Sequence, residues 1–443
     1  MTITGQEVFQ VQGITGNGTP SGQLELVTTG QMGSVGKTAT NSFALIGDSR
    51  IAQMFIDNAG VYMPSSPGHQ KTNHFFNVAN GLLGQRMKIA FSYGITGATT
   101  SQYLVNLPLA IASGASWLLM WSVYNDINQA AANGDNATTI WNRVKNGATT
   151  AINAGMNVIL MTEPGGSTFT ATQIGMVNQF NEYLREYASV TPGIFMFDIS
   201  QVILNPNSTT ITYNTSYSND GIHLNGYGSW FAGNAFSTFI SPLIPAQNSQ
   251  IFVNTDIAAN GNIQQVVNPL MVSGSGGTLN TGFTGTIPAS FSIFRKSGSP
   301  TGVVSVSADA NGYGNDMVVA CTFAAAGDII AIGNNQTIGN FTLPGDIVDS
   351  GCEIQVASGA TNLKAVYMST LFFGQYSNNA NDLLPLDTNP LPNIAMDMVL
   401  KTVPLPLTTA TTAISWQLFI EASGAGSATV TLKRPWLRRR YSV

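Results

Sequence analysis

A serine that could act as a nucleophile lies in the segment Gly47-Asp48-Ser49. The residues before it, 43–47, are an apolar run that ends in glycine, which is the pattern of a buried strand, and residues 51–56 have a helical pattern. Because open α/β sheets carry their sites beyond the carboxyl ends of the strands, we expect Ser49 at such an edge, near the positive end of the following helix. Gly-Asp-Ser alone also suits any turn that ends in a helix N-cap, so the interpretation depends on partners elsewhere in the chain.

A base that could take the serine proton lies in the segment Asp220-Gly221-Ile222-His223, just ahead of a predicted helix. Serine is a poor nucleophile unless a base accepts its proton. With this spacing one turn can hold the Asp220 carboxylate against Nδ1 of His223 and leave Nε2 free for a serine. An ordinary histidine pKa of about 6.5 keeps the imidazole available as a base near neutral pH. Most Asp-x-x-His pairs are only turn residues, so this motif indicates a catalytic base only if a nucleophile such as Ser49 lies beside it.

Donors for an oxyanion could come from two more loops, each of which follows a predicted strand. Asn125, followed by Asp126, comes after the apolar run Trp117–Trp121, and its side-chain amide could donate to an oxyanion. Gly97 lies in a glycine-containing strand exit, where a backbone N–H can approach a substrate without hindrance from a side chain. Each segment taken singly is equally typical of a tight turn or an N-cap.

The elements that must position these residues alternate between strand and helix over residues 38–245, which predicts a parallel, doubly wound, three-layer α/β sheet with right-handed crossovers. Residues 57–85 interrupt this rhythm with two prolines and two histidines, and we expect a long loop there that could rim the site. The predicted strands are 43–47, 88–92, 117–121, 157–162 and 194–198, and the predicted helices are 103–112, 138–154, 172–188 and 226–239.

The character of the sequence changes near residues 242–248. Over residues 246–443 short alternating stretches are separated by turns rich in Gly, Asn, Asp and Pro, the pattern of an antiparallel β-sandwich or jelly roll. Residues 1–37 read as a β arm or small attachment segment, which we expect to pack on a neighbouring domain or subunit. The chain therefore divides into 1–37, an α/β domain over 38–245 and a β domain over 246–443.

The composition excludes several classes of function. Charged residues make up only 9% of the 443 residues and the formal net charge is −5, so nothing indicates nucleic-acid binding. One basic cluster near the C-terminus could be a nucleic-acid tail, but the favoured interpretation is the end of a last strand whose cations project at an oligomer axis or a solvated edge. It consists of Lys433, Arg434, Arg438, Arg439 and Arg440. No apolar run is long enough for a membrane span, and the N-terminus does not have the pattern of a signal peptide. Cys321 and Cys352 could pair, but free buried thiols are the favoured interpretation.

Taken together, the four segments resemble the SGNH (GDSL-like) hydrolase family over roughly residues 40–245. The blocks match in order: Gly47-Asp48-Ser49, Gly97, Asn125-Asp126 and Asp220-x-x-His223. The resemblance implies a flavodoxin-like three-layer fold and an acyl-ester hydrolase with Ser49, His223 and Asp220 as catalytic residues. It also implies an oxyanion hole formed by the Ser49 and Gly97 N–H groups and Asn125. Two residues depart from the family pattern: Arg50 stands where leucine is usual, and Val123 where glycine is usual.

The layout of the whole chain resembles a bacteriophage tail fibre or tailspike that carries such a domain. This second resemblance implies a homotrimer in the virion, contact with other tail proteins, and action outside the cell on bacterial surface polysaccharide. The expected reaction is removal of O-acyl groups, chiefly O-acetyl. The β domain would then hold glycan or serve only in trimer assembly. A receptor-binding structural tail protein with an inactive hydrolase-like domain, and a bacterial secreted lipase or esterase with an accessory β domain, are the alternatives.

A metal-dependent site is a further alternative. Asp48, Asn125, Asp126, Asp220 and His223 could together form an oxygen-rich site for a divalent cation. Two-metal hydrolases generally use more histidines than this chain offers, so no metal and no cofactor is expected.

Overall fold

The computed structural model describes residues 40–54, 73–121, 123–246, 254, 266–337, 346–373, 389–408 and 411–440. The predicted N-terminal segment 1–37 lies outside the described residues, so that prediction is not tested. None of the described helices has the length and apolar character needed to cross a bilayer.

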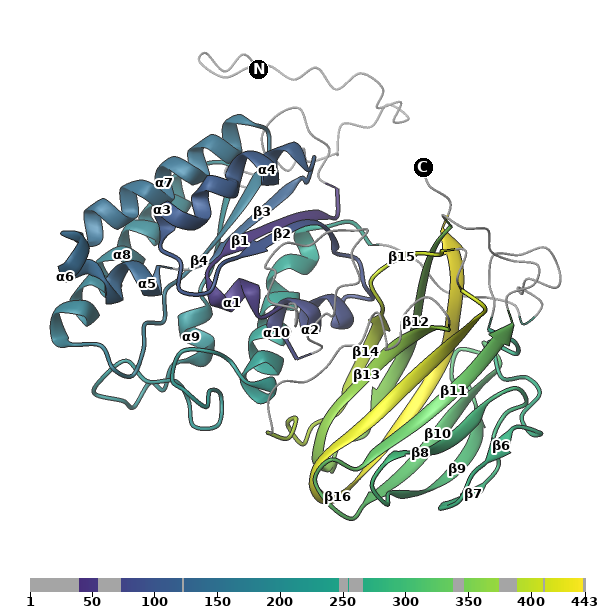
Figure 1. The fold of residues 1–443 in the computed structure, drawn as a ribbon. Coiled ribbons are helices and arrows are strands. Elements are labelled where there is room, and N and C mark those ends of the chain that lie inside the picture. Colours follow the sequence, from purple (N-terminus) through teal and green to yellow (C-terminus); the bar gives the residue numbers. More distant parts are fainter. Residues whose placement is uncertain are drawn as a thin grey trace, which may run out of the picture.

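Five parallel strands form the sheet of the α/β region, in the order β2-β1-β3-β4-β5 (Figure 1). This is the flavodoxin-like order, and the predicted α/β fold class is confirmed. Strands β3 and β4 are buried along their whole length, which explains their unbroken apolar sequences. The strands are β1 (Ser42–Gly47), β2 (Lys88–Gly94), β3 (Trp117–Trp121), β4 (Asn157–Met161) and β5 (Ile194–Phe197).

Helices cover both faces of this sheet and give it three layers. One apolar core joins a face of the sheet to α2, α9 and α10, and a second core joins the other face to α4, α7 and α8. The helical segments are α1 (Ser49–Ala52), α2 (Phe75–Leu82), α3 (Thr100–Tyr103), η2 (Leu104–Asn106), α4 (Leu107–Ala112), α5 (Tyr124–Asn128), α6 (Ala130–Asn133), α7 (Ala137–Asn153), α8 (Ala171–Val190), α9 (Ile199–Ile203), α10 (Gly226–Ile240) and η3 (Ser241–Leu243).

The start of α1 is fixed closely against the sheet. A Cβ atom at Gly94, the last residue of β2, would lie 2.0 Å from the backbone nitrogen of Ala52, so only glycine allows α1 this approach. Asp48 caps α1, and its side chain accepts a hydrogen bond from the Arg50 N–H. These local constraints place Ser49 at the first position of α1, just beyond the carboxyl end of β1.

The long loop predicted over residues 57–85 is wrong at its C-terminal end, where α2 forms. His74 is the N-cap of this helix, and its Nδ1 accepts a hydrogen bond from the Phe76 N–H. A histidine cap carries no familiar start signal in sequence, which explains the error. Residues 55–72, with His69, lie outside the described residues.

The C-terminal region is built of strands in a single hydrogen-bonded sheet, as the predicted all-β class requires. The 28-residue β16 pairs with β11 and β13 in its first half and with β10 and β12 further on, so it links two parts of the sheet around one core. The strands are β6 (Thr278–Leu279), β7 (Phe283–Gly285), β8 (Ser292–Ser297), β9 (Thr301–Ala308), β10 (Asn315–Phe323), β11 (Ile329–Thr337), β12 (Ile347–Val356), β13 (Thr361–Phe373), β14 (Met396–Lys401), β15 (Leu405–Pro406) and β16 (Ala413–Arg440).

Three of the basic residues near the C-terminus, whose side chains the structure describes, are paired with acids and do not project freely. Lys433 is paired with Asp309 and Asp316, Arg434 with Glu353, and Arg438 with Asp349. Each of these carboxylates lies within the β region, so the cations stabilise it internally. Both cysteines, Cys321 and Cys352, are buried free thiols.

The α/β and β regions pack against each other through α2 and β14 (Figure 1). Val78 of α2 and Trp230 of α10 belong to the same apolar core as the β strands, and Gln85 donates a 2.7 Å hydrogen bond to the Val399 carbonyl. The domain boundary near residue 245 stays a prediction.

Candidate active site

Ser49, His223 and Asp220 lie in one chain of hydrogen bonds. The Ser49 Oγ is 2.8 Å from His223 Nε2, and His223 Nδ1 is 2.6 Å from the Asp220 carboxylate. Serine and histidine are 174 residues apart in sequence and meet because β1 and the loop before α10 end at the same edge of the sheet. The arrangement has the connectivity of a nucleophile, a base and an orienting acid.

The Asp220 carboxylate fixes the state of the imidazole. Partial burial acts to raise the pKa of Asp220, but hydrogen bonds from the His223 ring and from the His223 and Ile222 backbone N–H groups lower it to about 2. An ionised carboxylate only accepts, so Nδ1 of His223 carries a proton, and in the neutral imidazole Nε2 then carries the lone pair. The Ser49 hydroxyl therefore donates to Nε2, the direction that general-base catalysis requires.

The three predicted oxyanion donors lie around the same strand ends. Within the described part of the chain, no acceptor is found for the backbone N–H of Ser49 or of Gly97, and Gly97 is exposed with φ +77°. Asn125 is different, because its side-chain amide donates to Asp48 Oδ2 at 3.2 Å and to the Ala98 carbonyl at 3.1 Å. An oxyanion could receive a hydrogen bond from Asn125 only by sharing or replacing one of these acceptors.

Arg50, the first departure from the family pattern, faces the protein interior. Only 2% of its surface is exposed, and its guanidinium forms two hydrogen bonds to Glu163, at 2.9 and 2.7 Å, and longer contacts to Asp48. It also lies over the Trp121 ring, 4.7 Å from the ring centre. Arg50 is therefore paired with buried acids and does not face solvent.

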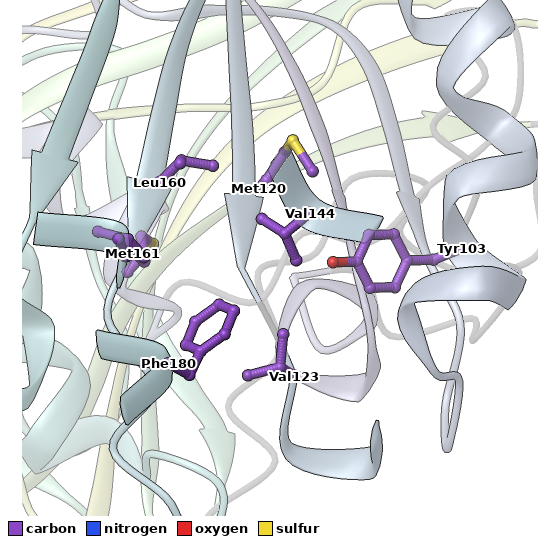
Figure 2. Close-up of a pocket in the computed structure, with 8 residues that line it drawn as sticks. Tyr103, Met120, Val123, Val144, Leu160, Met161 and Phe180 are labelled. Atoms are coloured by element: carbon purple, nitrogen blue, oxygen red, sulfur yellow. The ribbon is translucent and has the colours of Figure 1, made fainter. Parts of the chain in front are cut away.

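Val123, the second departure from the family pattern, is buried in the apolar core between the sheet and α4, α7 and α8. Figure 2 shows its side chain beside Met120, Phe180 and Tyr103 in a small apolar cavity between the sheet and its covering helices. The cavity lining does not include Ser49. Val123 therefore fills the core next to the Asn125 loop, and the Ser49 hydroxyl does not line the cavity that Val123 borders.

Asp126 ties the Asn125 loop to the Gly97 loop. Its fully buried carboxylate accepts hydrogen bonds from the N–H and the hydroxyl of Thr100, at 2.8 and 2.6 Å, and pairs with Arg143 of α7. Burial raises the pKa of Asp126, and these hydrogen bonds and the Arg143 charge oppose that rise. Sequence reasoning placed Asp126 beside the donor Asn125 but did not find this bracing role.

We expect Asp126→Ala to lower the free energy of unfolding by about 2–4 kcal/mol, because it leaves the buried Thr100 N–H without an acceptor and removes a buried partner of Arg143. Urea unfolding followed by circular dichroism measures this. Asp135→Ala is the matched control, since it removes the other carboxylate of Arg143, nearer the surface, and should cost about 1 kcal/mol or less. Equal losses for the two variants would contradict the bracing role.

The five residues of the metal alternative do not converge on one point. Asp48 is engaged by Arg50 and Asn125, and Asp126 by Thr100 and Arg143. Among the described residues, no group of three His, Cys, Asp or Glu side chains is arranged to hold a metal ion.

No protein-family model matches this chain, and no curated protein matches it. Solved structures are similar in fold. A GDSL-like lipase from Bacteroides thetaiotaomicron is 14% identical over 46% of this chain and 87% of its own, with a TM-score of 0.35. A member of the lipolytic protein G-D-S-L family from Veillonella parvula is 14% identical over 45% of this chain and 98% of its own, with a TM-score of 0.33.

A further similar structure is the enzymatically active domain of tailspike protein 4 of bacteriophage CBA120. It is 11% identical over 34% of this chain and 20% of its own, with a TM-score of 0.23. All these scores are low and less than half of this chain is covered, so the function proposed below rests on the geometry around Ser49.

Proposed function

We propose that this protein is a serine esterase of the carboxylic ester hydrolase class. The observation that carries the proposal is the chain of hydrogen bonds from Ser49 through His223 to Asp220, with distances of 2.8 and 2.6 Å. In this mechanism His223 takes the proton as the Ser49 oxygen attacks the ester carbonyl. The alcohol leaves with that proton, and water then hydrolyses the acyl-enzyme by the same route.

The oxyanion of each tetrahedral intermediate needs donors aimed at it. Of the three predicted donors, the N–H groups of Ser49 and Gly97 have no acceptor among the described residues, and we propose them as the oxyanion hole, with Asn125 joining by exchange of an acceptor. A negative oxygen is a stronger acceptor than the neutral Ala98 carbonyl that Asn125 now contacts, so this exchange is favoured once charge develops.

We further propose that the substrate is an O-acylated, chiefly O-acetylated, bacterial surface polysaccharide, and that the protein acts as a trimeric part of a phage tail. A charged fraction of 9% suits contact with a neutral polymer better than with an ionic one. A short acyl group agrees with the apolar cavity of Figure 2, because Ser49 is not among the residues that line this cavity and it offers no acyl pocket at the hydroxyl.

Acetate release and covalent labelling test the proposal together. The purified protein should release acetate from an O-acetylated polysaccharide and hydrolyse p-nitrophenyl acetate, and a fluorophosphonate should label one residue, Ser49, as located by mass spectrometry. Chemically deacetylated polysaccharide is the substrate control. A folded protein that neither hydrolyses an ester nor takes the label would overturn the proposal.

A receptor-binding tail protein with an inactive hydrolase-like domain is the second candidate. The observation in its favour is that both amide protons of Asn125 already have acceptors. This candidate predicts binding to cells or glycan with no acetate release. Light scattering of the purified chain, which should give three copies per particle, tests the trimer in either case.

A further inference from the structure

A buried group of three charged side chains lies beneath the proposed active site. It consists of Arg50, Asp48 and Glu163, each no more than 2% exposed. Burying charges costs several kcal/mol per ion unless partners satisfy them, so a group of this kind is retained only where its contacts are extensive. None of the roles assigned so far to Ser49, His223 and Asp220 uses Glu163.

The Glu163 carboxylate is fully occupied by four N–H donors. Oε1 accepts from Arg50 Nη1 and from the Gly165 backbone, both at 2.9 Å, and Oε2 accepts from Arg50 Nη2 at 2.7 Å and from the Val123 backbone at 3.1 Å. Its own backbone is held by Asn181 of α8, which exchanges two 2.8 Å hydrogen bonds with the Glu163 N–H and carbonyl. Glu163 is therefore a fixed point to which other segments are attached.

The segments attached to it are the exits of three neighbouring strands. Arg50 follows β1, Val123 follows β3 and Glu163 follows β4, and these strands are adjacent in the sheet. Ser49 immediately precedes Arg50, and Asn125 lies two residues after Val123. The contacts of Glu163 thus join the loop that carries the nucleophile to the loop that carries the third proposed oxyanion donor.

Asp48 completes the connection from the other side. Its carboxylate contacts the Arg50 guanidinium and also accepts the hydrogen bond from Asn125 Nδ2. His74 holds the Arg50 backbone, because its Nδ1 accepts from Phe76 and its Nε2 therefore donates to the Arg50 carbonyl at 2.8 Å. Arg50 is consequently held at its backbone carbonyl by His74, at its Nε by Asp48, and at both terminal nitrogens by Glu163.

We infer that the ion pair between Arg50 and Glu163 is a positioning device that sets the distance between the Ser49 hydroxyl and the oxyanion donor Asn125. Glu163 touches neither substrate nor reacting atoms and acts through the Arg50 and Val123 backbones. The inference rests on the proposed esterase function. It also accounts for the arginine at a position where the family pattern has leucine, because a leucine would leave the Glu163 carboxylate without its two strongest donors.

Glu163→Gln is the test, since it keeps the shape of the side chain and removes its charge. We expect kcat for p-nitrophenyl acetate to fall by about 10- to 100-fold while KM changes less than about threefold, because a misplacement of about 1 Å can cost 10² in rate. The rate of fluorophosphonate labelling at Ser49 should fall by the same factor. Arg50→Lys, which keeps the charge but not the paired donors, should show a smaller loss of the same kind.

Glu421→Gln is the matched control. It makes the same substitution at a buried glutamate in an ion pair, with Lys364 in the β region, and should leave kcat and the labelling rate unchanged. If Glu163→Gln does not fold, Arg50→Lys decides the question alone. A folded variant with wild-type kcat and labelling rate would overturn the inference.

Hydrogen exchange separates failure of this inference from failure of the proposed function. Glu163→Gln should speed exchange at the Val123 and Gly165 amides, which donate to the carboxylate, and unchanged exchange there would overturn the inference even in an inactive protein. A wild-type chain that is inert to ester and label, yet shows this faster exchange in the variant, would overturn the esterase function and leave the ion pair as a brace between loops.

Discussion

Ser49→Ala and His223→Ala are each expected to lower kcat for p-nitrophenyl acetate by about 10⁴-fold or more, with little change in KM. The hydroxyl supplies the attacking oxygen, and without the imidazole 2.8 Å away it keeps its proton. Neither side chain is needed to hold an ester near the oxyanion donors, so the loss should appear in kcat. Initial rates over a range of substrate concentration measure both constants for each variant.

The double variant Ser49→Ala/His223→Ala should be no slower than either single variant. The two groups act as one unit, so removing the second costs nothing once the first is gone. Ser189→Ala, at the surface end of α8, is the matched control and should keep the wild-type kcat. A loss in the double variant equal to the product of the two single losses would mean that the residues act independently.

The α/β region could be predicted well from the sequence because its signals are local. Central parallel strands are buried on both faces, so β3 and β4 are continuous apolar runs that stand out between amphipathic helices. In the β region the signal is weaker. Strand β12 has no clear alternation of apolar and polar residues, because Asp349 and Ser350 are polar and yet fully buried within it.

Those polar side chains are satisfied by partners distant in sequence. Asp349 pairs with Lys401 and Arg438, and Ser350 shares hydrogen bonds with Thr402 and Thr370. A local sequence pattern cannot predict ion pairs and hydrogen bonds between residues that are so far apart in the chain. The same reason explains why the sequence shows only short alternating stretches where the structure has the 28-residue strand β16, whose continuity depends on four neighbouring strands.

The residues of the proposed site also fall into those that the sequence could predict and those that it could not. Ser49 and the Asp220–His223 pair belong to short motifs, and the chain has only three histidines, so the sequence could single them out. Glu163 has no motif, and its partner Arg50 is 113 residues away. The signal available was an acid directly after a buried strand and before Pro-Gly-Gly, which is too common to assign a role without the contacts.

Asp220→Asn should lower kcat by about 10³- to 10⁴-fold while leaving the chain folded. The Asp220 carboxylate accepts the Nδ1 proton of His223 at 2.6 Å and so keeps Nε2 free as the base. An asparagine can turn its amide toward Nδ1 and donate, which moves the ring proton to Nε2 and leaves Ser49 without an acceptor. Ser218→Ala, which removes a neutral partner of the same carboxylate, should change kcat by less than about tenfold.

The pH dependence of folding stability is a second test of the contact between Asp220 and His223. The pKa of Asp220 is lowered to about 2, below its ordinary value, so its contribution to stability is present above about pH 4 and is lost as the pH falls toward 2. Because Asp220 is half exposed, the contribution is small. The difference in Tm between wild type and Asp220→Asn should therefore shrink from pH 5 to pH 2.5. A Tm difference that stays constant over this pH range would mean that the Asp220 carboxylate is not held by His223. In the kinetic test, a wild-type kcat in Asp220→Asn would mean that His223 is oriented by other groups.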